Sequence, residues 1–150
     1  MRSPLSINLL LMKGSSFPRS RIVLADDHKA TVAAVASFLE TDYDVVGAVG
    51  DGQSLVEAIE KLRPDVAVVD ISMPRMSGLA AGSRVRDLGS KTRVVFLTHQ
   101  RDPAFLYAAM AIGALGYVLK HRLASDLPLA IEAALAGRRF VSPPLADLHV

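Results

Sequence analysis

The sequence predicts an α/β domain with a doubly wound, five-stranded parallel sheet, because three patterns agree. After Ser20, short runs rich in β-branched residues alternate with longer runs rich in Ala and Leu. Strict alternation of strand and helix patterns favours parallel βαβ units. The run from Asp65 to Asp70 is apolar throughout its interior, which is typical of a strand covered by helices on both faces.

Each expected strand is a short run of mainly apolar residues. The five strands are expected at 21–25, 44–49, 65–70, 93–98 and 116–120. The five helices have apolar residues at helical spacing, and they are expected at 29–39, 54–62, 79–88, 103–112 and 125–136. Pro64, Gly89, Gly113 and Gly137 follow four of them as stop signals.

The start of the last helix is assigned to Ser125. Serine is a good N-cap, and Pro128 then falls in the first turn, where a missing N–H is tolerated.

Composition excludes several classes of protein. The chain has 150 residues, 51% of them hydrophobic, which suits one domain with a substantial core. It has no cysteine, so it has no disulfide scaffold and no thiolate metal site. Aromatic residues make up 5% and there is no Trp, which argues against a stacking surface for single-stranded nucleic acid.

Charge divides the chain into regions. Three of the 17 basic residues and none of the 15 acidic residues lie in residues 1–20, so the remainder carries a net charge of −1 and is not a basic nucleic-acid binder. We expect a flexible N-terminal extension (1–20), a folded domain (21–137) and a C-terminal tail or start of a linker (138–150). No apolar stretch is long enough to span a bilayer, and we expect a cytoplasmic protein without a membrane partner.

Polar side chains stand at the ends of four expected strands. Asp26 and Asp27 follow the first, Asp70 the third, Thr98 the fourth and Lys120 the fifth. Ligands of open parallel sheets bind outside the carboxyl ends of the strands. The sequence therefore predicts one crevice that holds three carboxylates, a hydroxyl and an ammonium group.

These groups suit phosphoryl transfer. Three neighbouring carboxylates repel one another, and a hard cation such as Mg²⁺ relieves that repulsion. A carboxylate can attack phosphorus to form an aspartyl phosphate. Mg²⁺ and Lys120 would supply positive charge, while Thr98 could donate a hydrogen bond to a phosphoryl oxygen.

In this order and on these strand ends, the residues resemble the receiver domain of two-component response regulators. The resemblance covers about residues 21–140 and extends to secondary marks, which are Met73-Pro74, Ser77-Gly78 and the run Gly113 to Lys120. It implies a flavodoxin-like (βα)5 fold. It also implies a phosphorylation-activated switch rather than a conventional enzyme. Such a domain nevertheless promotes its own phosphorylation and dephosphorylation. It also implies a sensor histidine kinase or phosphotransfer protein as partner.

The resemblance assigns a role to each residue. Asp70 is the phosphoacceptor. The Mg²⁺ ligands are Asp27, Asp70 and the backbone carbonyl of Ser72, and Asp26 assists through water. Thr98 and Lys120 contact the phosphoryl group. Tyr117 matches the switch aromatic that turns inward as Thr98 moves, which is a shift between two existing states with a changed surface, a homodimer being one output.

One departure concerns the residue after Lys120. Many receivers have a proline with a cis bond there, whereas His121 follows here, so we expect no cis bond. Histidines 28, 99, 121 and 149 lack the spacing of a metal site and are interpreted as surface or hydrogen-bonded imidazoles.

Two alternatives remain open. The stretch from Ala136 to Pro143 and the triplet Asp26-Asp27-His28 resemble the LuxR-type helix-turn-helix subfamily. The chain would then be the receiver fragment of a transcriptional regulator that contacts DNA only through a domain absent from this sequence. An enzyme on the same fold is disfavoured, because there is no nucleophile elbow or cofactor fingerprint, and Ser72 stands where related phosphatases place a second Asp.

Overall fold

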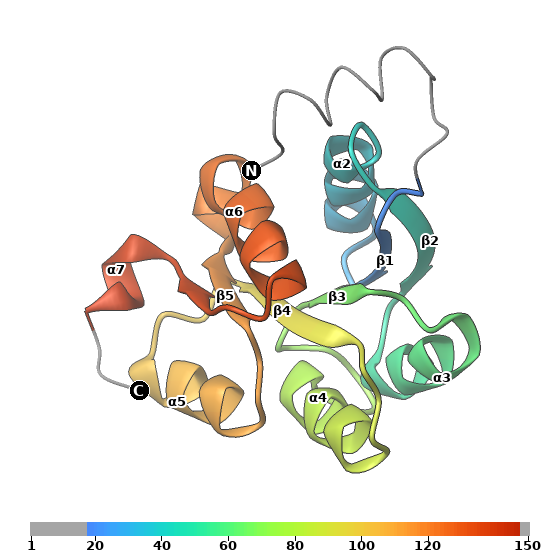
Figure 1. Ribbon diagram of the computed structural model, residues 1–150. Coiled ribbons are helices and arrows are strands. Elements are labelled where there is room, and N and C mark those ends of the chain that lie inside the picture. Colours follow the sequence, from blue (N-terminus) through green and yellow to red (C-terminus); the bar gives the residue numbers. More distant parts are fainter. Residues whose placement is uncertain (1–17, 148–150) are drawn as a thin grey trace.

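In the computed structural model, which describes residues 18–147, parallel strands form one central sheet between two layers of helices (Figure 1). The strand order is β2-β1-β3-β4-β5-β6, and every neighbouring pair is parallel. The bounds are β1 Arg21–Ala25, β2 Asp44–Val49, β3 Val66–Val69, β4 Arg93–Thr98, β5 Gly116–Leu119 and β6 Phe140–Val141. The doubly wound parallel fold is confirmed, but the described sheet has six strands rather than the five expected.

Helices cover both faces of the sheet, as the apolar interior of β3 predicts. The helices are α2 Lys29–Leu39, α3 Gly52–Leu62, α4 Gly78–Asp87, α5 Pro103–Ala111, α6 Leu123–Leu135 and the short α7 Pro143–Ala146. Leu39 of α2 and Ile131 of α6 belong to the core on one face, whereas Ile59 of α3, Val85 of α4 and Leu106 of α5 belong to the other.

Most helix ends follow local signals. Asp51 caps α3, its side chain accepting a hydrogen bond from Ser54 N at 2.8 Å. The helix therefore begins two residues before the expected start. Gly89, Gly113 and Gly137 follow their helices with positive φ, as helix stop signals require.

The expected start of the last helix was wrong. α6 begins at Leu123, directly after the 3₁₀ turn η1 (Lys120–Arg122), and Ser125 lies inside it. The early start is favoured by the Arg122 guanidinium, which donates from Nε to Asp126 Oδ2 at 2.7 Å and ties the turn to the helix. Pro128 consequently lies in the helix interior rather than in its first turn.

The sixth strand comes from the segment expected to be a tail or linker. Phe140 N donates to Leu115 O at 2.9 Å, and Ser142 N donates to Tyr117 O at the same distance. Leu145 of α7 is buried in the same core cluster as Leu106 of α5. Residues 140–142 therefore extend the sheet beside β5. Residues 1–17 and 148–150 lie outside the described residues.

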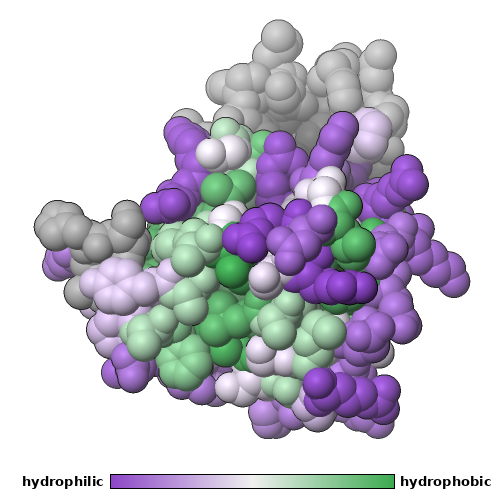
Figure 2. Space-filling model, turned by 90° about the horizontal axis from the view of Figure 1, so that it is seen from below, coloured by the Kyte–Doolittle hydropathy of each residue, from purple (hydrophilic) through white to green (hydrophobic). Residues whose placement is uncertain are grey.

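The α5 side of the molecule is unusually uncharged. From Pro103 to Leu119 the sequence contains no charged residue, although Tyr107 is 45% exposed. Figure 2 shows hydrophobic residues gathered on the left side of the molecule, the side that carries α5 in Figure 1. Among residues 18–147, no helix is long and apolar enough to cross a membrane.

Candidate functional site

The site begins where the strand order reverses, between β1 and β3. Asp26 and Asp70 directly follow these strands, which are hydrogen-bonded neighbours. Asp70 N donates to Ala25 O at 2.8 Å, and Asp26 N donates to Val49 O at 3.0 Å. The backbone ladder thus continues to the two acids and fixes their Cα positions at the carboxyl edge of the sheet, where open α/β sheets bind ligands.

Lys120 connects the two acids. Its Nζ lies 2.6 Å from Asp26 Oδ2 and 3.1 Å from Asp70 Oδ2. The three side chains are nearly buried, with exposed fractions of 7%, 9% and 7% respectively. The ammonium group therefore reaches the carboxylates from the residue that directly follows β5, two strands away from β3, and it lies at the strand end that the sequence predicts.

The electrostatics of this pairing favour the charged forms. Burial alone would raise the pKa of the Asp26 carboxyl, but hydrogen bonds from Lys120 and His28 outweigh it and hold that pKa below its usual value. Burial would likewise lower the pKa of Lys120, but its contacts with Asp26 and Asp70 raise it. These shifts favour the charged forms of Lys120 and Asp26, which pair at 2.6 Å.

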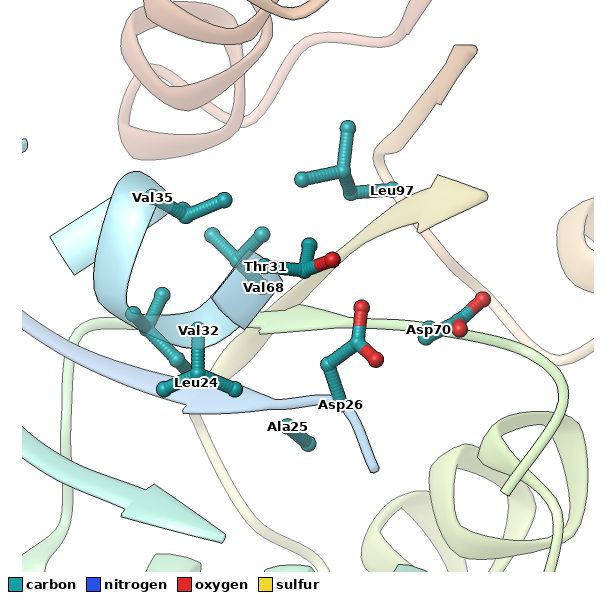
Figure 3. Close-up of a pocket in the computed structure, with 9 residues that line it drawn as sticks. All are labelled: Leu24, Ala25, Asp26, Thr31, Val32, Val35, Val68, Asp70 and Leu97. Atoms are coloured by element: carbon teal, nitrogen blue, oxygen red, sulfur yellow. The ribbon is translucent and has the colours of Figure 1, made fainter. Parts of the chain in front are cut away.

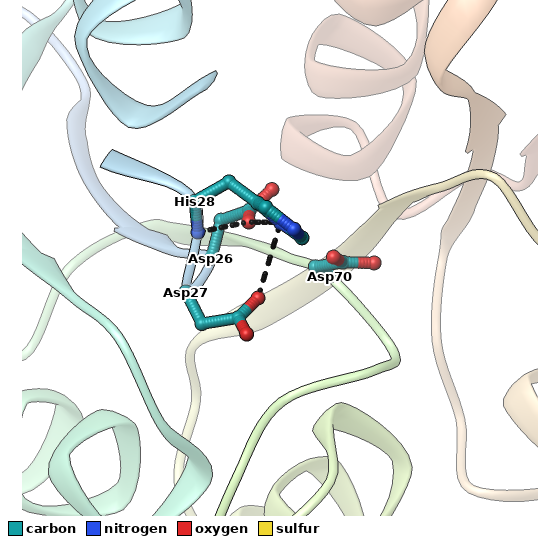
Figure 4. Close-up of side chains that lie close together, drawn as sticks. All are labelled: Asp26, Asp27, His28 and Asp70. Carbon is teal, nitrogen blue, oxygen red and sulfur yellow. Dashed lines mark hydrogen bonds and ion pairs between the residues drawn. The ribbon is translucent and has the colours of Figure 1, made fainter. Parts of the chain in front are cut away.

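The acidic cluster also includes Asp27 and His28. His28 Nδ1 lies 3.1 Å from Asp26 Oδ1 and 3.2 Å from Asp27 Oδ1, so its imidazole sits between the two carboxylates (Figure 4). Ligand atoms of Asp26, Asp27, His28 and Asp70 all lie within 4.8 Å of one another. The structure therefore brings the three predicted acids together, and their oxygen atoms fit a hard cation.

Two spaces of very different size border the acidic residues. Toward α2, a pocket lined by Asp26, Thr31 and Asp70 has about 10 Å³, which holds one water at most (Figure 3). On the outer side, an open hollow of about 460 Å³ is lined by residues that include Asp27, Ser72 and Phe105. Of these two spaces, the hollow beside Asp27 and Ser72 is the one large enough for a phosphoryl group.

Thr98 and Ser72 meet at Gln100, which sequence reasoning missed. Gln100 N donates to Thr98 Oγ1 at 3.2 Å, and its Nε2 donates to Ser72 Oγ at 3.1 Å. Thr98 is 1% exposed at the end of β4. The signal available in the sequence was the position of Gln100, two residues after a strand-end threonine.

Tyr117 belongs to the same group of contacts. Its ring is fully buried, and its hydroxyl donates to Gln100 O at 2.9 Å. Burial, followed by the charges of Asp102 and Asp70, raises the pKa of the phenol far above its usual value. The predicted switch aromatic therefore points inward here. No described peptide bond is cis, so the bond before His121 is trans, as expected.

The loop after Asp70 packs tightly on the site. A Cβ atom on Gly78 would lie 2.1 Å from Asp70 O, so only glycine allows this close approach. Gly78 N donates to Ile71 O at 2.7 Å, and the hydroxyl of Ser77 caps α4 by accepting from Ala80 N. The Ser77-Gly78 pair noted in the sequence thus holds the loop that carries Ser72.

Comparisons with known proteins agree with this geometry. Residues 22–132 match the model of the response regulator receiver domain. The transcriptional regulatory protein DesR of Bacillus subtilis is 34% identical over 128 residues, which is 84% of this chain and 63% of DesR. The oxygen regulatory protein NreC of Staphylococcus aureus is also 34% identical, over 83% of this chain and 59% of its own.

Solved structures show the same fold. A LuxR-family two-component response regulator from Aurantimonas sp. SI85-9A1 has a TM-score of 0.82 and 33% identity, covering 86% of this chain and 94% of its own. The receiver domain of NarL from Mycobacterium tuberculosis has a TM-score of 0.78 and 32% identity, covering 81% and 100%. The chain spans less than two thirds of the length of the curated relatives DesR and NreC.

Proposed function

The chain belongs to the response regulator receiver domain family, and from that premise we propose that it is a signalling switch phosphorylated on Asp70. The observation that carries this proposal is the placement of Lys120 Nζ 3.1 Å from Asp70 Oδ2, beside two further carboxylates. The phosphoryl donor is a phosphohistidine on a sensor histidine kinase or phosphotransfer protein, and the cytoplasm is the compartment that we expect.

The reaction is a transfer between two nucleophiles. A carboxylate oxygen of Asp70 attacks phosphorus, a P–O bond forms, and the P–N bond to the donor imidazole breaks with its electron pair left on that nitrogen. Lys120 offsets negative charge on the phosphoryl oxygens, and the hydroxyl of Thr98 donates a hydrogen bond to one of them. The same groups then promote hydrolysis of the acyl phosphate, so the domain assists its own phosphorylation and dephosphorylation.

The acidic cluster fits Mg²⁺. Three carboxylates with oxygen atoms within 4.8 Å of one another form a hard oxygen donor set. We propose Asp27, Asp70 and the backbone carbonyl of Ser72 as direct ligands, with Asp26 acting through water. Bound Mg²⁺ would neutralise charge on the phosphoryl oxygens. The ammonium group of Lys120 already pairs with Asp26 and Asp70. The lysine and a bound metal ion would therefore contact the same carboxylates.

The output that we propose is a change in association. Thr98, Gln100 and Tyr117 link the site to β5 through the contacts described above. A phosphoryl group that draws Thr98 toward Asp70 would change this linkage and the surface near it, which includes the uncharged α5. A second copy of the chain is the partner that we expect there.

A second proposal is a transcriptional output through a DNA-binding domain that is not part of these 150 residues. DesR is named as a transcriptional regulator, and RcsB, 27% identical with a TM-score of 0.78, is described as dimers bound to DNA. The reading frame that follows the codon of Val150 tests this proposal, since it either encodes a helix-turn-helix domain or does not.

Phosphorylation by a small phosphodonor tests the main proposal. With Mg²⁺ present, intact-mass spectrometry should show one added phosphoryl group on the wild-type chain and none on Asp70→Asn. Asp51→Asn is a matched control, because Asp51 caps α3 and does not belong to the acidic cluster. The same mass increase on wild type and Asp70→Asn would exclude Asp70 as the acceptor.

A further inference from the structure

A buried pair outside the acidic cluster connects the C-terminal segment to the end of β5. Ser142 is fully buried and Asp126 is 2% exposed. Ser142 Oγ donates to Asp126 Oδ2 at 2.8 Å and accepts from Leu119 N at 3.1 Å. Asp126 belongs to α6, whereas Ser142 follows β6. One hydroxyl therefore joins a helix, a strand end and the segment that leaves the sheet.

These contacts bracket Lys120 in the sequence. Leu119, the residue before it, donates its backbone N–H to Ser142. Arg122, two residues after it, donates from Nε to Asp126 at 2.7 Å. Lys120 itself opens the 3₁₀ turn between these two anchors. The position of its backbone therefore depends on the Asp126–Ser142 pair from both sides.

The contacts of Lys120 are sensitive to that position. Its Nζ lies 2.6 Å from Asp26 and 3.1 Å from Asp70, and hydrogen bonds weaken steeply when such distances grow. A group held in place before its ligand arrives binds that ligand more strongly than a mobile one.

Burial alone would raise the pKa of Asp126, but hydrogen bonds from Arg122 and Ser142 keep that pKa lowered. The hydrogen bond between Ser142 and Asp126 is therefore charge-assisted at neutral pH.

We propose that Ser142 and Asp126 are positioning residues for Lys120, and that docking of the segment from Phe140 to Leu145 thereby strengthens the binding of a phosphoryl group at Asp70. This inference rests on the proposed function of Asp70. Because coupling between two equilibria is reciprocal, a phosphoryl group at Asp70 stabilises the docked segment by the same factor. The segment is thus linked to the site without touching the phosphoryl group.

The first test measures ligand affinity. Beryllofluoride with Mg²⁺ serves as the phosphoryl mimic and is titrated by ¹⁹F NMR, while Mg²⁺ alone is titrated by the amide shifts of Asp27 and Asp70. Ser142→Ala should weaken beryllofluoride binding roughly three- to tenfold, the usual worth of one hydrogen bond, and leave Mg²⁺ affinity within about twofold of wild type. Ser142→Thr, which keeps the hydroxyl, should restore most of the affinity.

Thr92→Val is the matched control. Thr92 Oγ1 donates to Pro64 O at 2.8 Å. Thr92 precedes β4, so this bond lies at the amino-terminal ends of the strands, away from the acidic cluster at their carboxyl ends. This variant also loses a hydroxyl hydrogen bond, but it should leave beryllofluoride affinity unchanged. Equal affinity in wild type and Ser142→Ala, an equal loss in Thr92→Val, or an equal loss of Mg²⁺ affinity in Ser142→Ala would each overturn the inference.

The second test needs no variant. Hydrogen exchange at the amides of Phe140 and Ser142, which donate to Leu115 O and Tyr117 O, reports docking directly. Saturating beryllofluoride should slow exchange at both amides, because a ligand that binds the docked form more tightly lowers the population of the undocked form. Unchanged exchange in a protein whose ¹⁹F signal shows bound beryllofluoride would refute the coupling alone. A wild-type chain that binds no beryllofluoride would overturn the proposed function as well.

Discussion

The ammonium group of Lys120 lies 2.6 Å from the carboxylate of Asp26, although the two residues are 94 positions apart in the chain. The same ammonium contacts Asp70, so the acids hold the cation that the proposed reaction would use at the phosphoryl group. Lys120 therefore has a structural role in the metal-free protein as well as the proposed one in transfer. The stability of a variant without Lys120 measures the structural role alone.

Lys120→Met should destabilise the metal-free protein by about 3–5 kcal/mol, the usual cost of removing one partner from a buried ion pair. Mg²⁺ should restore part of this loss, because it neutralises the same carboxylates. Urea unfolding with and without Mg²⁺ measures both effects. Lys91→Met, at an exposed lysine, is the control. A Lys120→Met variant as stable as wild type without Mg²⁺ would show that the pairing contributes nothing net.

Tyr117→Phe should lower the free energy of unfolding by about 0.5–1.5 kcal/mol, because it loses only the hydrogen bond to Gln100 O. Tyr117→Ala should cost about 3–5 kcal/mol, since it leaves a cavity where a fully buried ring stood. Chemical denaturation of the two variants separates the hydroxyl from the ring. Equal losses in both would mean that packing of the ring is not what stabilises this position.

The same two variants also test the proposed switch. Both variants keep Asp70 and Lys120, so both should accept a phosphoryl group from a small donor, which intact-mass spectrometry checks. Both variants should lose the shift in size-exclusion volume that beryllofluoride is expected to cause in wild type, because each removes the hydroxyl that links Gln100 to β5. A full shift in Tyr117→Ala would remove Tyr117 from the output.

The acids and Lys120 could be predicted from the sequence because each stands out against its surroundings. Asp70 interrupts an apolar run at the point where a strand must end, and Lys120 does the same. The parallel topology then requires these ends to share one edge of the sheet. The shared crevice follows from that topology, whereas the strand order and the pairing of Lys120 with Asp26 come from the structure alone.

The remaining features lacked such a contrast. β6 has only two residues, Phe140 and Val141, which is too short for a periodic pattern. Asp126 resembles an ordinary acid in the first turn of a helix, and its burial depends on Ser142, 16 positions later. The early start of α6 depends on the pairing of Arg122 with Asp126. These are tertiary contacts between residues with no distinctive local pattern, and sequence propensity cannot specify them.

Gly78→Ala should destabilise the fold by about 1–3 kcal/mol and slow phosphorylation, because a new Cβ lies 2.1 Å from Asp70 O and must displace that backbone. Thermal unfolding and the rate of mass increase with a small phosphodonor measure the two effects. Gly89→Ala is the control: its φ of +74° imposes strain of about 1 kcal/mol, but nothing lies within 4 Å of the new Cβ. Gly89→Ala should therefore lose stability without a change in the phosphorylation rate. A normal phosphorylation rate in Gly78→Ala would show that the loop tolerates displacement of the Asp70 backbone.

Asp126 should make stability depend on pH in the acid range. Its pKa is lowered in the folded protein, so the unfolded chain binds more protons as the pH falls, and the stabilising contribution is present above the unfolded value of about 3.9. That contribution is lost as the pH falls through the folded pKa. The difference in free energy of unfolding between wild type and Asp126→Asn should therefore be largest near pH 7 and shrink toward about pH 3.

Urea unfolding at a series of pH values measures this difference. Asp42→Asn removes an exposed carboxylate with the same change in net charge, and it corrects for general charge effects. A difference between wild type and Asp126→Asn that stays constant from pH 7 to pH 3 would mean that the carboxylate charge contributes nothing. The buried hydrogen bonds from Arg122 and Ser142 would then stabilise α6 and β6 equally well with a neutral amide, because an amide oxygen accepts hydrogen bonds in the same geometry.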